Sequence, residues 1–328
     1  MTFRRNALSF LMMCAAGLAL ASLGADAAQG STATRAMCFV DEQHGWFAGN
    51  DGHNFVIWKT TDGGVTLKRQ SAHMGAGGGY ADVAFASKGI GLWADDTGVR
   101  FTRNGGASWR EGSRQGVWVP RDIGLASAKV GWASGAFGSD GMGGAISRST
   151  DGGRTWRSVK TVDAMPMNTF GPLSCPTLQR CYVVGYGNLQ GLWVTSDAGR
   201  HWVKRRLPAG FGRFDFATSL TGWAVGENGT VLKTVDGGVT WKRQTSGTER
   251  GLYELFFTDA SHGWAVGEQG VILHTDDGGE QWTEQSSGTT AGLWDVCFID
   301  RLHGWAVGGD DREVRLRTTD GGKTWKRL

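Results

Sequence analysis

Seven copies of one short phrase recur along the chain at nearly even spacing. The clearest copies are Thr234–Trp241 (TVDGGVTW) and Thr318–Trp325 (TTDGGKTW). Neighbouring copies lie 43 residues apart on average. Repeats of about 40–50 residues built from short strands are the signature of a β-propeller, in which each repeat forms one blade. The copies are centred on Asp62, Asn104, Asp151, Asp197, Asp236, Asp277 and Asp320.

A second phrase, Gly-Trp-Ala-Val-Gly, recurs in step with the first. It is complete at Gly222–Gly226, Gly263–Gly267 and Gly304–Gly308, and related segments precede the other four copies of the first phrase. Because the two phrases alternate seven times, the sequence predicts seven structurally equivalent units.

Each repeat is predicted to form four short strands. In the sixth repeat we expect strands at 253–257, 263–267, 271–274 and 281–285, with the Asp277 phrase as the tight turn before the last one. Asp-Gly and Gly-Gly between strand-like runs are hairpin signals, because glycine adopts positive φ without a steric penalty. The predicted fold is an all-β, seven-bladed β-propeller with four antiparallel strands per blade, and with the acidic turn between the third and fourth strands. We expect the ring to close without an exchanged strand.

The acidic residue of each turn is predicted to have a structural role. A short carboxylate accepts backbone N–H bonds within its own turn, and the tryptophan that follows offers an apolar face for packing between blades. Single copies vary, since Asn104 replaces Asp, Ala198 replaces Gly and Leu67 replaces Trp. A structural role tolerates such changes, so the seven central residues are interpreted as turn formers and not as catalytic or metal-binding groups.

The N-terminal segment has the pattern of a secretory signal peptide. Arg4 and Arg5 precede an apolar run over 7–24, and Ala25-Asp26-Ala27 resembles a cleavage site. We therefore expect residues 1–27 to be removed and residues 28–328 to form a single propeller domain. The prediction places the mature protein outside the cytoplasm, in a periplasm or its lumen-side equivalent.

The charge balance argues against nucleic acid as a partner. Without residues 1–27 the chain has 32 basic and 30 acidic side chains, which is too balanced for a nucleic-acid-binding surface. Basic residues nevertheless follow most turn phrases, at Lys68, Arg69, Arg110, Arg157, Lys204, Arg205, Arg206, Lys242, Arg243, Lys326 and Arg327. Such a belt either protects exposed outer strands from pairing or meets an acidic partner or membrane surface. We favour the first alternative, and we expect a monomer.

Four cysteines remain after the signal peptide, in an oxidising compartment. Cys175 and Cys181 are close in sequence between two strands of one blade, and we predict a disulfide between them. Cys38 and Cys297 occupy the same repeat position in the first and last blades. Because equivalent positions point in the same rotational sense, we expect two buried thiols in place of a second bond.

The repeated box S/T-x-D-x-G-x-T-W is the Asp-box, or bacterial neuraminidase repeat. Its combination with His-Gly-Trp-Ala-Val-Gly, as at His262–Gly267, resembles the photosystem II assembly factors. The resemblance covers Ala36–Leu328. It implies a seven-bladed scaffold without catalysis or cofactor, which helps to fold or assemble a membrane complex from the non-cytoplasmic side. Proteins of that family bind the newly made D1 subunit in cyanobacteria and plastids. The partner implied here is a protein or an extended peptide segment, such as an unassembled membrane-protein subunit, with peripheral membrane contact as an additional option.

Polar and aromatic residues recur near the start of the expected innermost strands. We predict that they surround the mouth of the central channel and bind the partner, although residues of these types can also seal the channel by pairing with one another. Glu227, Glu268, Asp95 and Asp96 are expected to be solvated on the same face. The predicted partner-binding residues are Tyr80, Asp82, Trp118, Arg121, Asp122, Arg213, Tyr253, Glu254, Trp294 and Asp295.

The main alternative is an exo-acting, sialidase-like glycoside hydrolase or a glycan-binding propeller. Sialidases with this repeat use an Arg-Ile-Pro motif, which this chain lacks. Nothing in the spacing selects two opposed carboxylates for hydrolysis. His44, His262 and His303 share one repeat position before Gly-Trp, which indicates a turn and not a metal site. The sequence thus favours a binding protein over an enzyme and predicts no metal site.

Overall fold

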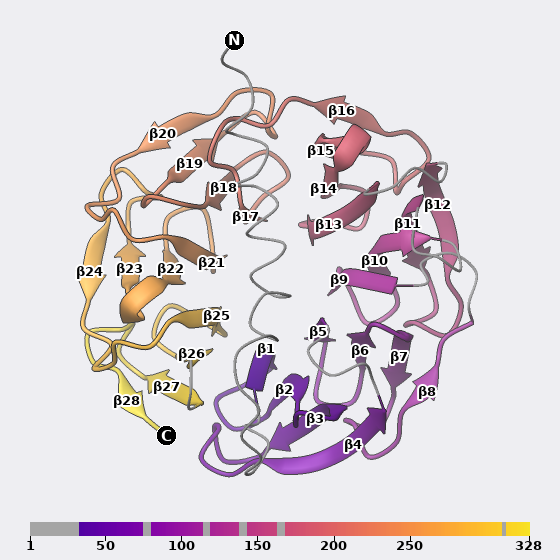
Figure 1. Ribbon diagram of the computed structural model, residues 1–328, viewed down its shortest axis with the longest axis horizontal. Coiled ribbons are helices and arrows are strands. Elements are labelled where there is room, and N and C mark those ends of the chain that lie inside the picture. Colours follow the sequence, from indigo (N-terminus) through magenta and orange to yellow (C-terminus); the bar gives the residue numbers. More distant parts are fainter. Residues whose placement is uncertain (1–32, 75–79, 114–118, 138–142, 163–167, 310–312) are drawn as a thin grey trace, which may run out of the picture.

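The computed structural model describes residues 33–74, 80–113, 119–137, 143–162, 168–309 and 313–328. These residues form seven four-stranded antiparallel sheets around a central axis (Figure 1). The predicted all-β, seven-bladed propeller is thereby confirmed, including the position of each acidic turn between the third and fourth strands. Within the described residues, no helix is long and apolar enough to cross a membrane.

Each blade contributes one strand to each of four concentric layers. The innermost strands are β1 (Ala33–Phe39), β5 (Ala81–Phe85), β9 (Val119–Leu125), β13 (Thr169–Ser174), β17 (Arg213–Phe216), β21 (Leu252–Phe257) and β25 (Leu293–Phe298). The second strands are β2 (Gly45–Asn50), β6 (Gly91–Asp95), β10 (Gly131–Phe137), β14 (Cys181–Tyr186), β18 (Gly222–Val225), β22 (Gly263–Gly267) and β26 (Gly304–Gly308).

The two outer layers follow in chain order. The third strands are β3 (Asn54–Thr60), β7 (Gly98–Thr102), β11 (Gly143–Ser149), β15 (Gly191–Thr195), β19 (Val231–Thr234), β23 (Ile272–Thr275) and β27 (Val314–Thr318). The outermost strands are β4 (Lys68–Met74), β8 (Arg110–Glu111), β12 (Arg157–Val162), β16 (Val203–Arg205), β20 (Lys242–Gln244), β24 (Thr283–Gln285) and β28 (Lys326–Arg327). Two single 3-10 turns, η1 (Gly187–Leu189) and η2 (Glu268–Gly270), connect second and third strands.

Three hydrogen bonds of the turn motif recur in all seven copies, and the four copies with a threonine four residues after the acid add a hydroxyl bond, as the fifth blade illustrates. The Asp236 carboxylate accepts the backbone N–H of Thr240 at 3.0 Å and the Thr240 hydroxyl at 2.6 Å. Thr234 Oγ1 donates to Asp236 at 2.8 Å and accepts the backbone N–H of Gly238 at 2.9 Å. Gly237 and Gly238 both have positive φ, which explains the paired glycines of the phrase. The interpretation of these acids as turn formers therefore agrees with the geometry.

Aromatic stacking joins neighbouring blades. Trp46 of the first blade is fully buried and stacks on Phe85 of the second, with ring centroids 3.5 Å apart. Its indole N–H donates to Gly105 O in the turn of that second blade, at 3.2 Å. Trp305 repeats both contacts across the ring closure, with Phe39 at 3.7 Å and Gly63 O at 2.8 Å. The second-strand aromatics thus contribute a large buried area, and five of the seven satisfy their polar atom in the next blade. The buried indole N–H groups of Trp93 and Trp132 have no hydrogen-bond partner within the described residues.

The ring closes without strand exchange, as predicted. The seventh sheet consists of β25, β26, β27 and β28, and the first consists of β1 to β4. Cys175 and Cys181 form the predicted disulfide. Cys38 and Cys297 are free thiols, and the Cys38 sulfur accepts the backbone N–H of Phe85 in the next blade, at 3.3 Å.

Candidate functional site

Five charged residues occupy equivalent positions on innermost strands, and we call them the channel ring: Asp82, Asp122, Arg213, Glu254 and Asp295. Each lies opposite the fourth residue of a second-strand phrase, as in the pairs Arg213↔Val225 and Glu254↔Val266. In the first blade Ala36 occupies this position. Because the innermost strands surround the axis (Figure 1), equivalent positions on them lie around the same level of the channel.

The three aspartates of the ring connect neighbouring innermost strands. Asp82 accepts the backbone N–H of Ile123 at 3.0 Å, Asp122 accepts that of Leu173 at 3.0 Å, and Asp295 accepts that of Met37 at 2.7 Å. Each bond crosses from one blade to the next, and the last one crosses the ring closure. Sequence reasoning missed this role, because the contacts join residues that are 41 to 258 positions apart.

Arg213 is the only cation of the channel ring and pairs with two of its acids. Its guanidinium lies 3.3 Å from the Asp122 carboxylate and 3.5 Å from that of Glu254. The ring therefore contains the ion pairs that are expected if its charged residues seal the channel by pairing with one another. Four acids nevertheless surround one arginine, so the ring has a surplus of acidic groups.

Burial determines the protonation of these acids. Loss of solvent raises the pKa of Glu254 to about 7, although nearby Arg213 opposes the shift. Burial also raises the pKa values of Asp122 and Asp295 well above their usual range, and the neighbouring carboxylates Asp82 and Glu254 add to this. Tyr80 lies beside Asp82, and its burial raises its own pKa. Asp122, Glu254 and Asp295 are therefore easier to protonate than exposed carboxyl groups.

Two predicted aromatic residues form a stack beside the ring, which we call the aromatic shelf. Tyr253 and Trp294, from the sixth and seventh blades, are parallel within 10° at 4.8 Å between centroids. Arg35 lies over the Trp294 ring, 5.6 Å from its centroid. The Trp294 indole N–H donates to Gly309 O at 3.2 Å, and the Tyr253 hydroxyl donates to Glu268 at 3.4 Å. Both side chains are half-buried, so part of each ring faces solvent.

Arg35 was not among the predicted site residues. Arg35 directly precedes Ala36, the residue of the first blade at the channel-ring position. An alignment of the seven innermost strands would therefore have identified it. Arg121 is exposed on β9, and its charge acts against the burial that raises the pKa of Asp96. Trp118 lies outside the described residues.

The expectation that Asp95 is solvated was wrong. Its side chain is fully buried and forms an ion pair with Arg100 at 2.6 Å, from the facing strand β7. Asp95 also accepts the backbone N–H of Thr97 at 2.9 Å. Asp95 is buried although it ends a strand, because the hairpin between β6 and β7 places the Arg100 guanidinium over its carboxylate.

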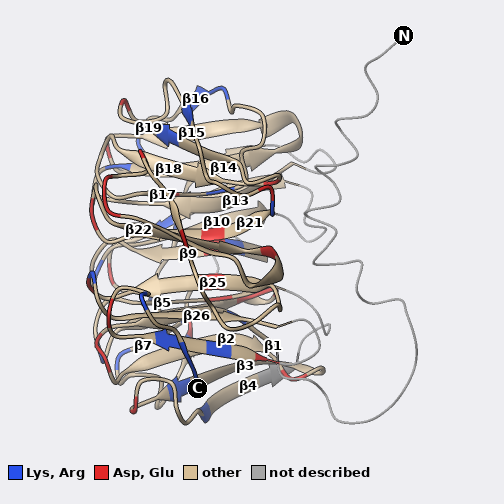
Figure 2. Ribbon diagram, turned by 90° about the vertical axis from the view of Figure 1, so that its left-hand side faces the viewer, with Lys and Arg blue, Asp and Glu red and all other residues tan. Residues whose placement is uncertain are grey.

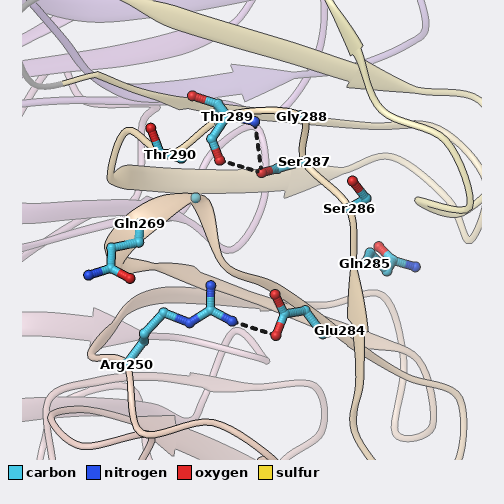
Figure 3. A pocket seen from close by; sticks show the side chains of 10 residues that line it. Arg250, Gln269, Glu284, Gln285, Ser286, Ser287, Gly288, Thr289 and Thr290 are labelled. Carbon is cyan, nitrogen blue, oxygen red and sulfur yellow. Dashed lines mark hydrogen bonds and ion pairs between the residues drawn. The ribbon is translucent and has the colours of Figure 1, made fainter.

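A polar pocket lies outside the channel, at the connection between the sixth and seventh blades (Figure 3). Its volume is about 590 Å³. Arg250 forms an ion pair with Glu284 across it, and Ser287 donates to Thr289 O at 3.2 Å (Figure 3). These polar groups bond to one another, so we interpret the pocket as a solvent-filled space between two loops. It is lined by Arg250, Gln269, Gly270, Glu284, Gln285, Ser286, Ser287, Gly288, Thr289 and Thr290.

The described residues contain no group of three or more His, Cys, Asp or Glu side chains arranged to hold an ion. His44, His262 and His303 bond instead to the acid three positions earlier, at 2.9, 3.0 and 2.8 Å respectively. The interpretation of this repeated histidine as a turn residue thus agrees with its contacts.

Fold and repeat motif together define the chain as a seven-bladed Asp-box propeller with a charged ring around its channel. Comparison with known families agrees. Residues 211–287 match the model of the photosystem II assembly factor YCF48, and residues 316–327 match the BNR/Asp-box repeat. The predicted resemblance to the Ycf48 photosystem II assembly factors is confirmed over these residues, on a seven-bladed propeller.

One curated relative is the photosystem II assembly lipoprotein Ycf48 of Synechococcus sp. (strain CC9902). It is 26% identical over 238 residues, which are 67% of this chain. The match spans 65% of the length of that relative, slightly under two thirds.

Solved structures show the same fold at low identity. A structure of YCF48 bound to a D1 peptide has a TM-score of 0.69 at 19% identity, covering 91% of this chain and 98% of the other. YCF48 from Cyanidioschyzon merolae has a TM-score of 0.67 at 16% identity, with 89% and 98% covered. A xyloglucanase from Xanthomonas campestris has a TM-score of 0.57 at 15% identity, with 90% and 60% covered. Enzymes therefore share this architecture as well.

Proposed function

We propose that this chain is an exported, non-catalytic scaffold that captures an extended segment of an unassembled membrane-protein subunit. The segment binds at the mouth of the channel, against the aromatic shelf and against Arg121 on β9, across the channel from β21 and β25 (Figure 1). The observation that carries the proposal is the shelf itself, because it offers half-buried aromatic faces flanked by Arg35 beside the mouth. Aromatic and arginine side chains of this kind provide most of the binding energy in protein interfaces.

The comparisons support a peptide ligand. The structure of YCF48 bound to a D1 peptide belongs to the same repeat family and shares the fold. The Synechococcus relative is an assembly lipoprotein, which supports a location outside the cytoplasm. The channel ring contributes the floor of the proposed site, and its acids favour a segment that carries a backbone or side-chain donor toward the axis.

A crosslinked capture from envelope extracts tests this proposal. The native chain is compared with a Tyr253→Ala, Trp294→Ala, Arg121→Ala variant, which leaves the paired Arg213 in place. A matched control replaces three exposed outer-strand cations, as Lys68→Ala, Arg110→Ala and Lys326→Ala. We expect one membrane subunit to be captured by the native chain and the control and lost from the shelf variant. Equal capture by all three proteins contradicts the proposed site.

A glycoside hydrolase is the second candidate, because one acid has the protonation that general acid catalysis needs. Glu254 has a pKa of about 7 and lies in a ring with further carboxylates. Against it, the three ring aspartates accept backbone N–H groups and are thereby occupied. The test is hydrolysis of a panel of aryl glycosides: turnover by the native chain that Glu254→Gln abolishes would establish an enzyme and contradict the scaffold.

A further inference from the structure

The charges of the chain are unevenly distributed around the ring. The third and fourth blades, residues 119–206, contain eleven basic and five acidic residues, a net charge of +6. Residues 207–328, which form the last three blades, contain twelve basic and seventeen acidic residues, a net charge of −5. An asymmetry of this size within one domain creates a positive surface that attracts anionic partners.

One junction between blades concentrates this excess. Between the fifth and sixth blades, Lys233 of β19 meets Glu280 in the next Asp-box turn, at 3.3 Å. Between the third and fourth blades the corresponding residues are Arg148 and Arg200, two like charges. Burial lowers the pKa of Arg148, and Arg200 lowers it further. The buried Arg148 Nε has no hydrogen-bond partner within the described residues.

Exposed aliphatic residues gather next to this junction. The described residues include eight large hydrophobic side chains that are exposed, and five of them belong to the fourth and fifth blades. Leu178 and Leu220 lie in loops between first and second strands, while Val235 and Val239 lie in the Asp-box turn of the fifth blade, the latter two 66% and 62% exposed. All four therefore lie on the face of the Asp-box turns, opposite the connections between blades.

Direct contacts make these residues one continuous surface. The turn of the fourth blade donates from Ala198 N to Gln179 O at 2.8 Å, which places Arg200 beside the loop of Leu178. Arg180, in the same loop, donates to Ser219 O at 2.8 Å, next to Leu220. Arg205 donates to Gly237 O in the turn that carries Val235 and Val239. The acids nearby are engaged within their own turns, as Asp236 is with Thr240.

We propose that this surface, the basic–aliphatic patch, docks the protein on an anionic membrane. The patch is defined by Leu178, Arg180, Arg200, Leu220, Val235 and Val239. Blue segments on β16, at the top of Figure 2, show that basic residues continue onto the adjacent outer strand. The patch combines separate cations on several loops with exposed aliphatic side chains between them. This arrangement fits a fluid anionic membrane, because lipid headgroups can move to meet each charge. A folded acidic segment would need convergent cations instead.

Vesicle flotation tests the inference independently of the channel site. The mature chain is mixed with phosphatidylcholine vesicles, with or without 30 mol % phosphatidylglycerol. We expect binding only to the anionic vesicles, and loss of binding at high salt, since exposed charges are screened. Arg180→Ser, Arg200→Ser removes the two cations of the patch, and at about fivefold each should lower binding about 25-fold. The variant Leu178→Ser, Val235→Ser, Val239→Ser should also bind more weakly.

Two results overturn the proposal. Lys68→Ser, Arg110→Ser, Lys326→Ser removes three exposed cations from other blades and should bind like the parent. If it loses as much binding as the patch variant, the attraction comes from net charge and not from this patch. A polyglutamate peptide serves as the second probe, and binding of that peptide without binding of anionic vesicles would assign the patch to an acidic protein.

Discussion

The Asp-box turns and the channel ring use the same chemical group in opposite environments. At the edge of the molecule, the Asp320 carboxylate accepts the Thr324 hydroxyl at 2.6 Å and the Thr324 N–H at 2.9 Å. These bonds lower the pKa of Asp320 to about 2. Around the channel, burial raises the pKa of Glu254 to about 7. Hydrogen-bond donors in solvent favour the charged carboxylate, whereas burial favours the protonated one.

The difference has opposite consequences for stability. An acid with a lowered pKa stabilises the folded state above its unfolded pKa, and this stabilisation is lost as pH falls through the folded value. An acid with a raised pKa stabilises the fold below its unfolded pKa, and this contribution is lost as pH rises through the folded value. The stabilisation from the turns is therefore lost as the pH falls from about 4 to 2. The contribution of Glu254 to stability is lost as the pH rises from about 4.5 to 7.

Removal of the only cation of the channel ring should have the largest effect on stability. Arg213→Ala leaves the half-buried acids Asp122 and Glu254 without their partner, and we expect the free energy of unfolding to fall by about 3–5 kcal/mol at pH 8. The loss should be smaller at pH 6, where Glu254 is protonated. Urea unfolding at the two pH values measures both. The control Arg243→Ala, on an exposed outer strand, should change stability by less than about 0.5 kcal/mol. Equal effects of the two variants would show that the ring is solvated.

The next largest effect concerns Glu254 alone. Glu254→Gln cannot ionise, so the parent should lose stability relative to this variant as pH rises from 4.5 to 7. A folded pKa of about 7 against an ordinary value of 4.5 corresponds to about 3 kcal/mol over that interval. Urea unfolding of both proteins from pH 4 to 8 measures the difference. A constant difference across the range would mean that Glu254 is not buried in solution.

A single Asp-box turn should matter less. Asp236→Ala removes the acceptor of Thr240 and should cost about 1–2 kcal/mol. Asp236→Asn should cost under about 1 kcal/mol, because Asn104 already occupies this position in the second blade, where its side-chain oxygen accepts Ser108 N–H at 2.9 Å. Thermal unfolding of the two variants compares them. If Asp236→Asn is the more damaging change, charge and not hydrogen bonding stabilises the turn.

The smallest expected effect is a stabilisation. Ala198 has φ 62° at a position where the other six copies have glycine with φ between 67° and 76°. Alanine in this region is strained, so Ala198→Gly should raise stability by up to about 1 kcal/mol. The control Ala107→Gly, in the turn of the second blade, lies outside the left-handed region and should be neutral or slightly destabilising. A loss of stability in Ala198→Gly would show that the strain is negligible.

Most of the fold could be predicted from the sequence because it repeats. The phrase around Asp236 determines a turn, and the phrase Gly222–Gly226 determines a buried strand. Each depends only on residues that are close in sequence, so both can be predicted from the sequence. The disulfide between Cys175 and Cys181 is equally local. Ring closure without exchange followed from the order of strands at the two ends of the repeat array.

The site could be predicted only in part, because its contacts cross between blades. The innermost-strand positions of Asp82 and Asp295 were evident, but their bonds to Ile123 N and Met37 N were not. Asp95 was misjudged because burial depends on how Arg100 folds over it, which spacing does not reveal. The partner-binding role of the shelf stays a prediction.

Site-specific photocrosslinking measures whether the partner contacts the aromatic shelf. A photoreactive phenylalanine analogue replaces Tyr253 on the aromatic shelf or, as the control, Val65, which is exposed in an Asp-box turn on the opposite face. Both proteins are irradiated in envelope extracts. We expect one discrete adduct with a membrane-protein subunit from position 253 and none from position 65. Adducts with that subunit from position 65 alone would place the partner on the opposite face and contradict the proposed site.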